Sequence, residues 1–201
     1  MRENYIKQIS EAKIYPIIRC KDCDRTVEIA EALIKGGIKI LEINIENPSL
    51  YKAINVISEK ATVCAGSVIT NLQAHTAFKS GAKLFSSPIF QLNMVKISKN
   101  IGVPFIASAT TPSEAYVAWK ARIPLIKIFP ASDMGGVNYI GDTLRQMPFL
   151  NVLPLGGIKL SEVDDYLSAG AVAVGVGRDF YENLSPNEIT ERAKMIVSKL
   201  N

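Results

Sequence analysis

Two patterns of hydrophobic and polar positions alternate along the whole chain. Short apolar runs are typical of buried strands, and the segments between them repeat apolar residues at intervals of three and four, as amphipathic helices do. One such helical stripe contains Val27, Ala30, Leu33 and Ile34. The pattern predicts eight strands, at residues 15–18, 40–45, 62–65, 83–86, 103–106, 125–129, 152–155 and 171–174.

Strict alternation of strands and helices predicts a parallel sheet, because a helical crossover must return the chain to the start of the next strand. Eight such units predict an α/β fold closed into a (β/α)8 TIM barrel, here preceded by a short N-terminal helix near residues 3–11. A doubly wound open sheet is the alternative. Since no linker or low-complexity run interrupts the pattern, we expect residues 1–201 to form a single (β/α)8 barrel domain.

Composition removes several classes of function. The 201 residues are 48% hydrophobic and 21% charged, with a net charge of +4 that is not gathered into a basic block, so we expect no nucleic-acid partner. No apolar run reaches the roughly 18–20 residues of a membrane span, and the N-terminus lacks a secretory pattern, so we expect a cytoplasmic protein. Cys20, Cys23 and the distant His75 are too few for a zinc site, and no metal is expected.

Lys127 is the most unusual residue, because it lies within the apolar run 125–130. Burying an unpaired ammonium is unfavourable, and a neutral amine in an apolar pocket is a nucleophile towards carbonyls. Glu42 is a carboxylate in a similar apolar strand, which favours an acid/base partner for an imine-forming lysine. The alternatives are an edge-strand lysine with its head in solvent, or a structural ion pair in the barrel core.

The active site of such a barrel is expected at the C-terminal ends of its strands. Glu42, Asn44 and Glu46 share one face of the second strand, because they are spaced by two. After the last two strands, glycines occur in pairs, where backbone N–H groups can approach a phosphate closely. Arg178 could add a bidentate contact. The alternative is that the glycines only form tight turns. The glycines and the arginine in question are Gly156, Gly157, Gly177 and Arg178.

These residues resemble a known family, the class I aldolases of 2-keto-3-deoxy-6-phosphogluconate (KDPG) and 4-hydroxy-2-oxoglutarate (KHG). The resemblance covers nearly the whole chain and implies a (β/α)8 barrel that needs no cofactor and assembles as a homotrimer. It implies that Lys127 is the Schiff-base lysine and Glu42 the general acid/base. Its most specific segments are residues 36–42, 65–68, 87–88, 127–131 and 156–158.

The resemblance also implies further site residues. Ser67 helps to hold the pyruvate carboxylate, and Arg19 matches an active-site arginine of many members. Pro88 and Phe129 line the pocket, and Leu155 lies beside it at the end of the seventh strand. The four residues Gly156, Gly157, Gly177 and Arg178 occupy the positions where the family holds the substrate's phosphate.

The expected function is cleavage of KDPG to pyruvate and glyceraldehyde 3-phosphate, or of KHG to pyruvate and glyoxylate, or both. The chain departs from KDPG aldolases at Glu46, where they carry an arginine that grips the substrate carboxylate, and at Leu155, where they carry threonine. Both departures are similar to the branch that acts on 2-keto-3-deoxy-6-phosphogalactonate, which is the first alternative. In such a site Arg19 would have to bind the carboxylate. A non-catalytic phosphate-binding barrel is the alternative from another class.

Overall fold

The computed structural model of the chain describes residues 2–200, and the side chains of residues 5–200. Eight strands alternate with helices in this range. The strands are β1 (Ile14–Ile18), β2 (Ile40–Asn44), β3 (Thr62–Gly66), β4 (Leu84–Ser87), β5 (Phe105–Ala109), β6 (Ile126–Ile128), β7 (Val152–Pro154) and β8 (Val174–Val176).

Nine α-helices are found among residues 2–200, and two short 3-10 helices precede the last two of them. The leading helix is close to the one that the sequence predicts. The helices are α1 (Arg2–Ala12), α2 (Cys23–Lys35), α3 (Leu50–Ser58), α4 (Asn71–Lys79), α5 (Leu92–Ile101), α6 (Pro112–Lys120), α7 (Gly136–Gln146), η1 (Leu160–Glu162), α8 (Val163–Ser168), η2 (Arg178–Phe180) and α9 (Pro186–Leu200).

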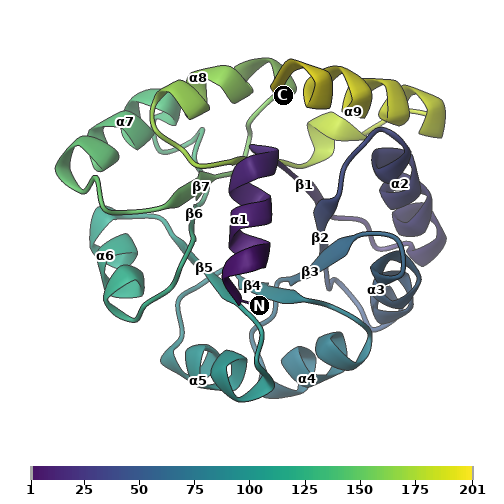
Figure 1. The fold of residues 1–201 in the computed structure, drawn as a ribbon, viewed down its shortest axis with the longest axis horizontal. Helices are drawn as coiled ribbons and strands as arrows, with labels where there is room; N and C mark the ends of the chain where they lie inside the picture. The colour runs from purple at the N-terminus through teal and green to yellow at the C-terminus, as the bar shows by residue number, and fades with distance from the viewer. Residues whose placement is uncertain (1, 201) are drawn as a thin grey trace.

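The eight strands form one parallel sheet in which sequence neighbours pair from β1 to β7, and β8 pairs with β1. The ring closes between β7 and β8 through an isolated bridge from Leu155 to Gly175 and a 3.1 Å hydrogen bond from Val172 N to Val152 O. Figure 1 shows helices α2 to α9 outside this ring. The TIM barrel with an N-terminal helix is therefore confirmed, and the open sheet is wrong.

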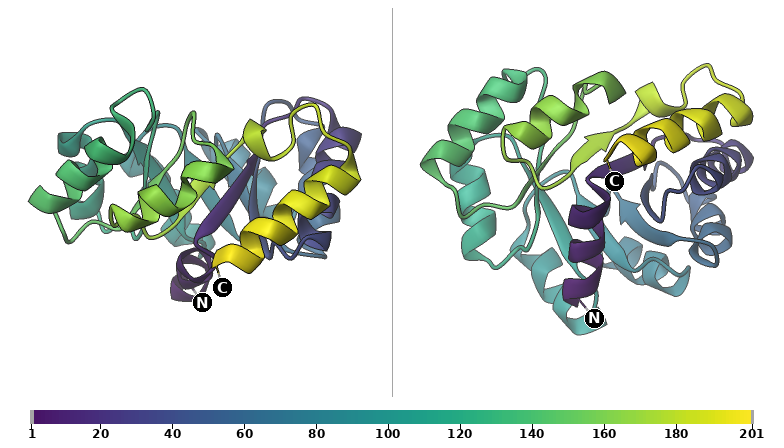
Figure 2. Two further views of the ribbon diagram at one scale, coloured as in Figure 1. Left: turned by 90° about the horizontal axis from the view of Figure 1, so that it is seen from above. Right: turned by 45° about the horizontal axis from the view of Figure 1, so that its top comes forward.

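Two separate cores follow from the two faces of the strands. The larger one lies between the strands and the outer helices, and the smaller one fills the ring with side chains of alternate strand positions. Ile9 of α1 is fully buried in the smaller core, and α1 crosses the middle of the ring (Figures 1 and 2). Since β1 starts two residues after α1, this helix covers the N-terminal end of the barrel.

The inward-facing positions change from apolar to polar towards the C-terminal end of the barrel. The inward-facing residues of β2 are, in chain order, Ile40, Glu42 and Asn44. At the sixth strand they are Leu125, which lies just before β6, and Lys127 within it. The apolar residues join the smaller core, whereas the polar ones line a cavity. The sequence thus builds a hydrophobic floor beneath a polar site.

Two strands lie later in the chain than predicted. The fifth was predicted at 103–106 and is Phe105–Ala109, and the eighth was predicted at 171–174 and is Val174–Val176. Gly175 pairs with Tyr15 inside β8, where a Cβ would lie 2.7 Å from the Cβ of Leu155. Glycine is needed there for close packing inside the strand, and not for a turn.

Helix ends follow the residue types that cap them. Thr70 and Thr111 each form a capping box at the start of α4 and α6, with Gln73 and Glu114 as the partners three residues on. Among residues 2–200, we find no helix both long and apolar enough to cross a bilayer.

Candidate active site

Lys127 and Glu42 form an ion pair inside the ring, from the middle of β6 to the middle of β2. Lys127 Nζ donates to both carboxylate oxygens of Glu42, at 2.6 Å for Oε1, and to Ser86 Oγ at 2.8 Å. The two charged residues are only 3% and 2% exposed. Lys127 is therefore not an edge-strand lysine with its head in solvent. It is also not an unpaired amine in an apolar pocket, because the Glu42 carboxylate is in direct contact with its Nζ.

Tyr15 of β1 contacts the same carboxylate from the hydrophobic floor. Its hydroxyl donates to Glu42 Oε2 over 3.2 Å, and its ring centroid lies 5.8 Å from Lys127 Nζ. Burial, followed by the charges around it, raises the pKa of Tyr15 well above the usual value, so the phenol keeps its proton and acts as a donor. Burial and the Glu42 carboxylate likewise raise the pKa of the Cys64 thiol, which stays uncharged.

Asn44 connects Glu42 to Arg19 at the mouth of the site. Its carboxamide satisfies both neighbours when its nitrogen faces Glu42, at 3.0 Å from Oε1, and its oxygen accepts from Arg19 Nε and Nη2, at 3.1 and 3.3 Å. Arg19 Nε also lies 3.5 Å from Glu46 Oε1. Gly66 leaves the room for this arrangement, because a Cβ there would lie 2.0 Å from the carboxamide atom of Asn44 that faces Glu42 and 2.5 Å from Glu42 Oε1.

These groups surround a cavity of about 50 Å³ at the C-terminal end of the barrel. This is room for a few water molecules. Seven of the residues expected at the site line it, together with Ile17, Asn44, Ser86, Ser87 and Ser108. The seven are Arg19, Glu42, Ser67, Pro88, Lys127, Phe129 and Leu155.

The four residues expected to bind phosphate lie outside the lining of this cavity. Gly156 and Gly157 adopt φ values of +99° and +74°, and a Cβ on Gly156 would meet the Phe129 ring at 2.8 Å. The Arg178 side chain is 72% exposed and lies 3.7 Å from Glu182. The loops after β7 and β8 do meet, since Leu160 N donates to Asp179 Oδ2 over 2.8 Å. Their geometry is compatible with tight turns and with a phosphate near Leu155, so both interpretations stay open.

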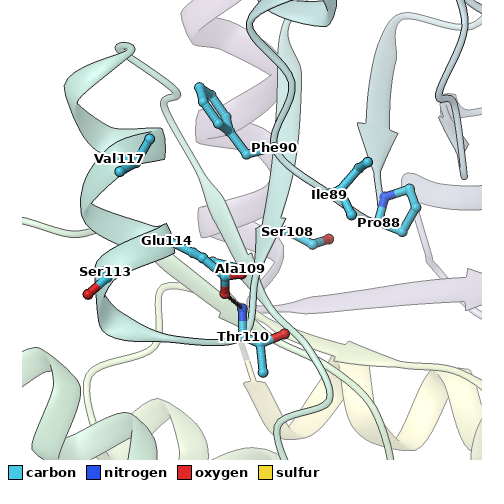
Figure 3. A pocket seen from close by; sticks show the side chains of 9 residues that line it. All are labelled: Pro88, Ile89, Phe90, Ser108, Ala109, Thr110, Ser113, Glu114 and Val117. Atoms are coloured by element: carbon cyan, nitrogen blue, oxygen red, sulfur yellow. Dashed lines mark hydrogen bonds between the residues drawn. The ribbon is translucent and has the colours of Figure 1, made fainter.

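A larger cavity of about 350 Å³ lies beside the first and shares Pro88 and Ser108 with it (Figure 3). Its other lining residues come from the loop after β4, from Ala109 and Thr110 at the end of β5, and from α6. Glu114 is its charged residue, and that carboxylate accepts from the backbone N–H of Thr110 at 2.8 Å. Among the described residues, no lysine lines this cavity, whereas Lys127 lines the smaller one.

Sequence reasoning gathered Asn44, Ser86 and Ser108 among the polar residues at the strand ends but gave them no role, and it gave none to Tyr15. The signal for the first three is that they share the inward face with Glu42 or lie level with Lys127. Tyr15 could have been found because a buried phenol normally has a hydrogen-bond partner. Among residues 5–200, no group of three or more histidine, cysteine or acidic side chains is arranged to hold a metal ion.

The chain is similar to a set of enzymes of known class. A sequence profile described as "KDPG and KHG aldolase" matches residues 5–192. The 2-dehydro-3-deoxy-phosphogluconate aldolase of Haemophilus influenzae is 28% identical over 90% of this chain and 86% of that protein. A probable 2-dehydro-3-deoxy-6-phosphogalactonate aldolase of Rhizobium meliloti is 26% identical over 91% of this chain and 89% of that protein.

Solved structures give the same fold. The KDPG aldolase of Zymomonas mobilis, crystallised with 3-phosphoglycerate, superposes with a TM-score of 0.88 over 98% of this chain and 97% of that chain, at 22% identity. The KDPG aldolase of Legionella pneumophila, with pyruvate captured as a covalent carbinolamine, superposes with a TM-score of 0.84 at 25% identity, over 94% and 95% of the two chains.

Proposed function

Because the chain belongs to the KDPG and KHG aldolase family and is thereby a lyase, we propose that it is a class I aldolase whose Schiff base forms on Lys127. The observation that carries this proposal is the buried pair of Lys127 and Glu42, which faces a cavity of about 50 Å³. A nucleophilic lysine needs a base beside it, and Glu42 is within hydrogen-bonding distance of its Nζ. This cavity supplies the place where the carbonyl carbon would lie.

The proposed reaction starts when Glu42 accepts a proton from Lys127, which leaves a neutral amine. Nζ attacks the C2 ketone of a 2-keto-3-deoxy acid, and Glu42 shuttles protons through water during carbinolamine formation and loss of water. Glu42 then removes the proton of the C4 hydroxyl, the C3–C4 bond breaks, and its electron pair moves into the iminium. The aldehyde leaves, and the enamine is protonated at C3 and hydrolysed to pyruvate.

We propose KDPG, KHG or both as substrates, and the sister epimer 2-keto-3-deoxy-6-phosphogalactonate as the second candidate. The names of the Haemophilus and Legionella proteins support the first assignment. Glu46 and Leu155 support the second, because the family resemblance places an arginine and a threonine there in KDPG aldolases. The Rhizobium relative adds weight to this second candidate. Arg178 and the paired glycines are the proposed phosphate contacts in either case.

Reductive trapping tests the Schiff base. The chain is incubated with pyruvate and borohydride, and the adduct is located by peptide mass spectrometry. We expect one adduct on Lys127 and none in Lys127→Met, while Lys79→Met on the surface of α4 is trapped like the unchanged protein. An adduct of equal yield in Lys127→Met contradicts the proposal.

Cleavage assays with the two phosphorylated epimers and with KHG separate the candidate substrates. We expect Arg178→Ala to lower kcat/KM for phosphorylated substrates and to leave that for KHG unchanged. Binding of a phosphorylated sugar acid without cleavage of any of the three would instead favour a non-catalytic phosphate-binding barrel.

We propose in addition that the chain forms a homotrimer, on the family resemblance alone, and sedimentation equilibrium tests this.

A further inference from the structure

Glu46 raises a question that the family resemblance does not answer. A carboxylate at this position should repel the carboxylate of a 2-keto acid, yet it lies at the mouth of the proposed site. Arg19 is the cation next to it, and besides Lys127 it is the only positively charged residue that lines the small cavity. The contacts of Arg19 therefore decide how a substrate carboxylate can bind.

Three contacts hold Arg19 in place. Its backbone N–H donates to the hydroxyl of Tyr181 over 2.9 Å, which holds the end of β1. Asn44 Oδ1 accepts from Nε and Nη2 of the guanidinium, and Glu46 Oε1 lies 3.5 Å from Nε. A guanidinium has five N–H donors in a planar fork. These contacts use the edge formed by Nε and Nη2, so the edge formed by Nη1 and Nη2 remains for a carboxylate.

Asn44 has little freedom to adopt another arrangement. It is 3% exposed, and the absence of a side chain on Gly66 leaves space for the end of its carboxamide that faces Glu42. Its carboxamide lies between a carboxylate and a guanidinium, with the N–H towards Glu42 and the oxygen towards Arg19. Each end of the amide dipole thus faces the charge that it stabilises, which makes the reverse orientation unfavourable.

We propose that Asn44 and Glu46 are positioning residues that hold Arg19 as the anchor of the substrate's carboxylate. Glu46 then does not oppose the substrate, because its charge is matched by Arg19 and it contacts the Nε side of the guanidinium. Asn44 sets the distance from this anchor to Glu42, and through Glu42 to Lys127. The inference rests on the proposed aldolase function, and it assigns the carboxylate contact that Glu46 leaves open.

Glu46→Ala distinguishes two roles for Glu46, which either orients Arg19 or competes with the substrate carboxylate. The two roles predict opposite changes in the KM for pyruvate. If Glu46 orients Arg19, its loss raises the KM for pyruvate, measured as half-saturation of the borohydride adduct, by about twofold to fivefold, the effect of a partly exposed ion pair. If Glu46 competes with the substrate, its loss lowers that KM, and the proposal is overturned. Glu11→Ala, on α1 at the opposite end of the barrel, is the matched control.

Asn44→Leu and Asn44→Asp separate the two ends of the carboxamide. Asn44→Leu keeps the volume but removes the acceptor for Arg19, and we expect KM for pyruvate to rise about tenfold or more. Asn44→Asp keeps an acceptor for Arg19 but places a second carboxylate beside Glu42. We therefore expect kcat for substrate cleavage to fall, while the KM for pyruvate stays near that of the unchanged protein. Asn93→Leu, exposed on α5, is the control.

The result that overturns the role of Asn44 is an unchanged KM in Asn44→Leu, or a KM in Asn44→Asp that rises as much as in Asn44→Leu. Should Asn44→Leu fail to fold, Asn44→Asp and Glu46→Ala still decide the matter. Failure of the proposed function gives a different result, because the unchanged protein would then form no adduct with pyruvate at all.

Discussion

Glu42 accepts hydrogen bonds from three side chains that come from three different strands. Lys127 and Tyr15 donate to it directly, and Asn44 donates to Oε1 in the orientation that satisfies its neighbours. An ionised carboxylate only accepts, and it has about four lone-pair directions, so this environment fits the ionised form. The same three donors keep the carboxylate in one place. A group that must exchange a proton with both Lys127 and a substrate hydroxyl needs such a fixed position.

Tyr15→Phe isolates one of these donors, because it removes the hydroxyl and keeps the ring that packs in the smaller core. Loss of a hydrogen bond to a charged group is worth about 1.5–3 kcal/mol, but the bond here is 3.2 Å long, so we expect kcat to fall by about threefold to tenfold. Steady-state kinetics at neutral pH measure it. Tyr116→Phe, half-exposed on α6, is the control. An unchanged kcat would mean that Lys127 and Asn44 alone position Glu42.

Gly66→Ala tests the crowding around the same carboxylate. The new methyl would lie 2.0 Å from the carboxamide atom of Asn44 that faces Glu42 and 2.5 Å from Glu42 Oε1, so both side chains must move. We expect a loss of about 1–3 kcal/mol in the free energy of unfolding, as for other overpacked sites, and a large loss of kcat. Gly141→Ala on α7 is the matched control, because among the described residues its new methyl has no neighbour within 4 Å apart from its chain neighbours and the backbone of its own helix. Full activity in Gly66→Ala would contradict the tight arrangement of Glu42 and Asn44.

At the residue scale, the sequence revealed side chains whose charge conflicts with their surroundings. Lys127 and Glu42 could be found because a charge inside an apolar run has few explanations. Tyr15 gave a weaker signal, because a buried phenol normally has a hydrogen-bond partner but the sequence does not say which one. Its partner became visible only when β1 and β2 were paired, with Ile17 level with Glu42. Catalytic roles at all these positions stay predictions until the variants are measured.

At the scale of elements, the alternation of strands and helices was enough to predict the barrel, but not all strand boundaries. β5 continues through Ser108 and Ala109, and β8 contains Gly175, although small residues and glycines often mark the end of a strand. Those small residues are needed where the strands crowd at the site and where β7 meets β8. Propensity describes a residue alone, whereas these positions are decided by the neighbouring strand.

The start of α6 is stabilised by Glu114, and this contribution depends on pH. The backbone N–H groups of Thr111 and Thr110 hold the pKa of the Glu114 carboxyl below its usual value. A lowered pKa in the folded state stabilises the fold above the unfolded pKa of about 4.3, and this stabilisation is lost as the pH falls through the folded pKa.

Glu114→Gln should therefore reduce the free energy of unfolding at pH 7 by about 0.3–1 kcal/mol, the value of an exposed charge at a helix N-terminus. The difference from the unchanged protein should shrink as the pH falls from about 4.3 through the lowered pKa of Glu114. Urea unfolding at pH 7 and at a series of lower pH values measures it, and Glu11→Gln on α1 is the control. A difference that persists at low pH would mean that packing, and not the charge, is responsible.

At the scale of the whole molecule, the two ends of the barrel have different tasks. The C-terminal end carries Lys127 and Glu42, and the N-terminal end is covered by α1, whose Ile9 reaches into the smaller core. The end of α9 also reaches this side of the barrel, since Lys13 Nζ, just after α1, donates to Leu200 O over 2.8 Å. The smaller core connects the two ends, because Tyr15 belongs to it and also contacts Glu42. We propose that residues 1–201 form one domain that unfolds as a single unit.

Ile9→Ala tests this division of tasks. Removing three carbons from a fully buried side chain should lower the free energy of unfolding by about 2–4 kcal/mol, because the smaller core cannot collapse freely inside a ring of strands. The catalytic groups lie at the other end, so kcat at 25 °C should stay within about twofold of the unchanged value, well under the tenfold that corresponds to 1.4 kcal/mol. Met195→Ala, 72% exposed on α9, should change neither quantity.

Far-ultraviolet circular dichroism and the fluorescence of Trp119 should give the same unfolding midpoint in each variant, because a single unit loses its helices and its tertiary packing together. Two separate midpoints in Ile9→Ala would show instead that α1 and the barrel floor unfold apart from the strands that carry Lys127.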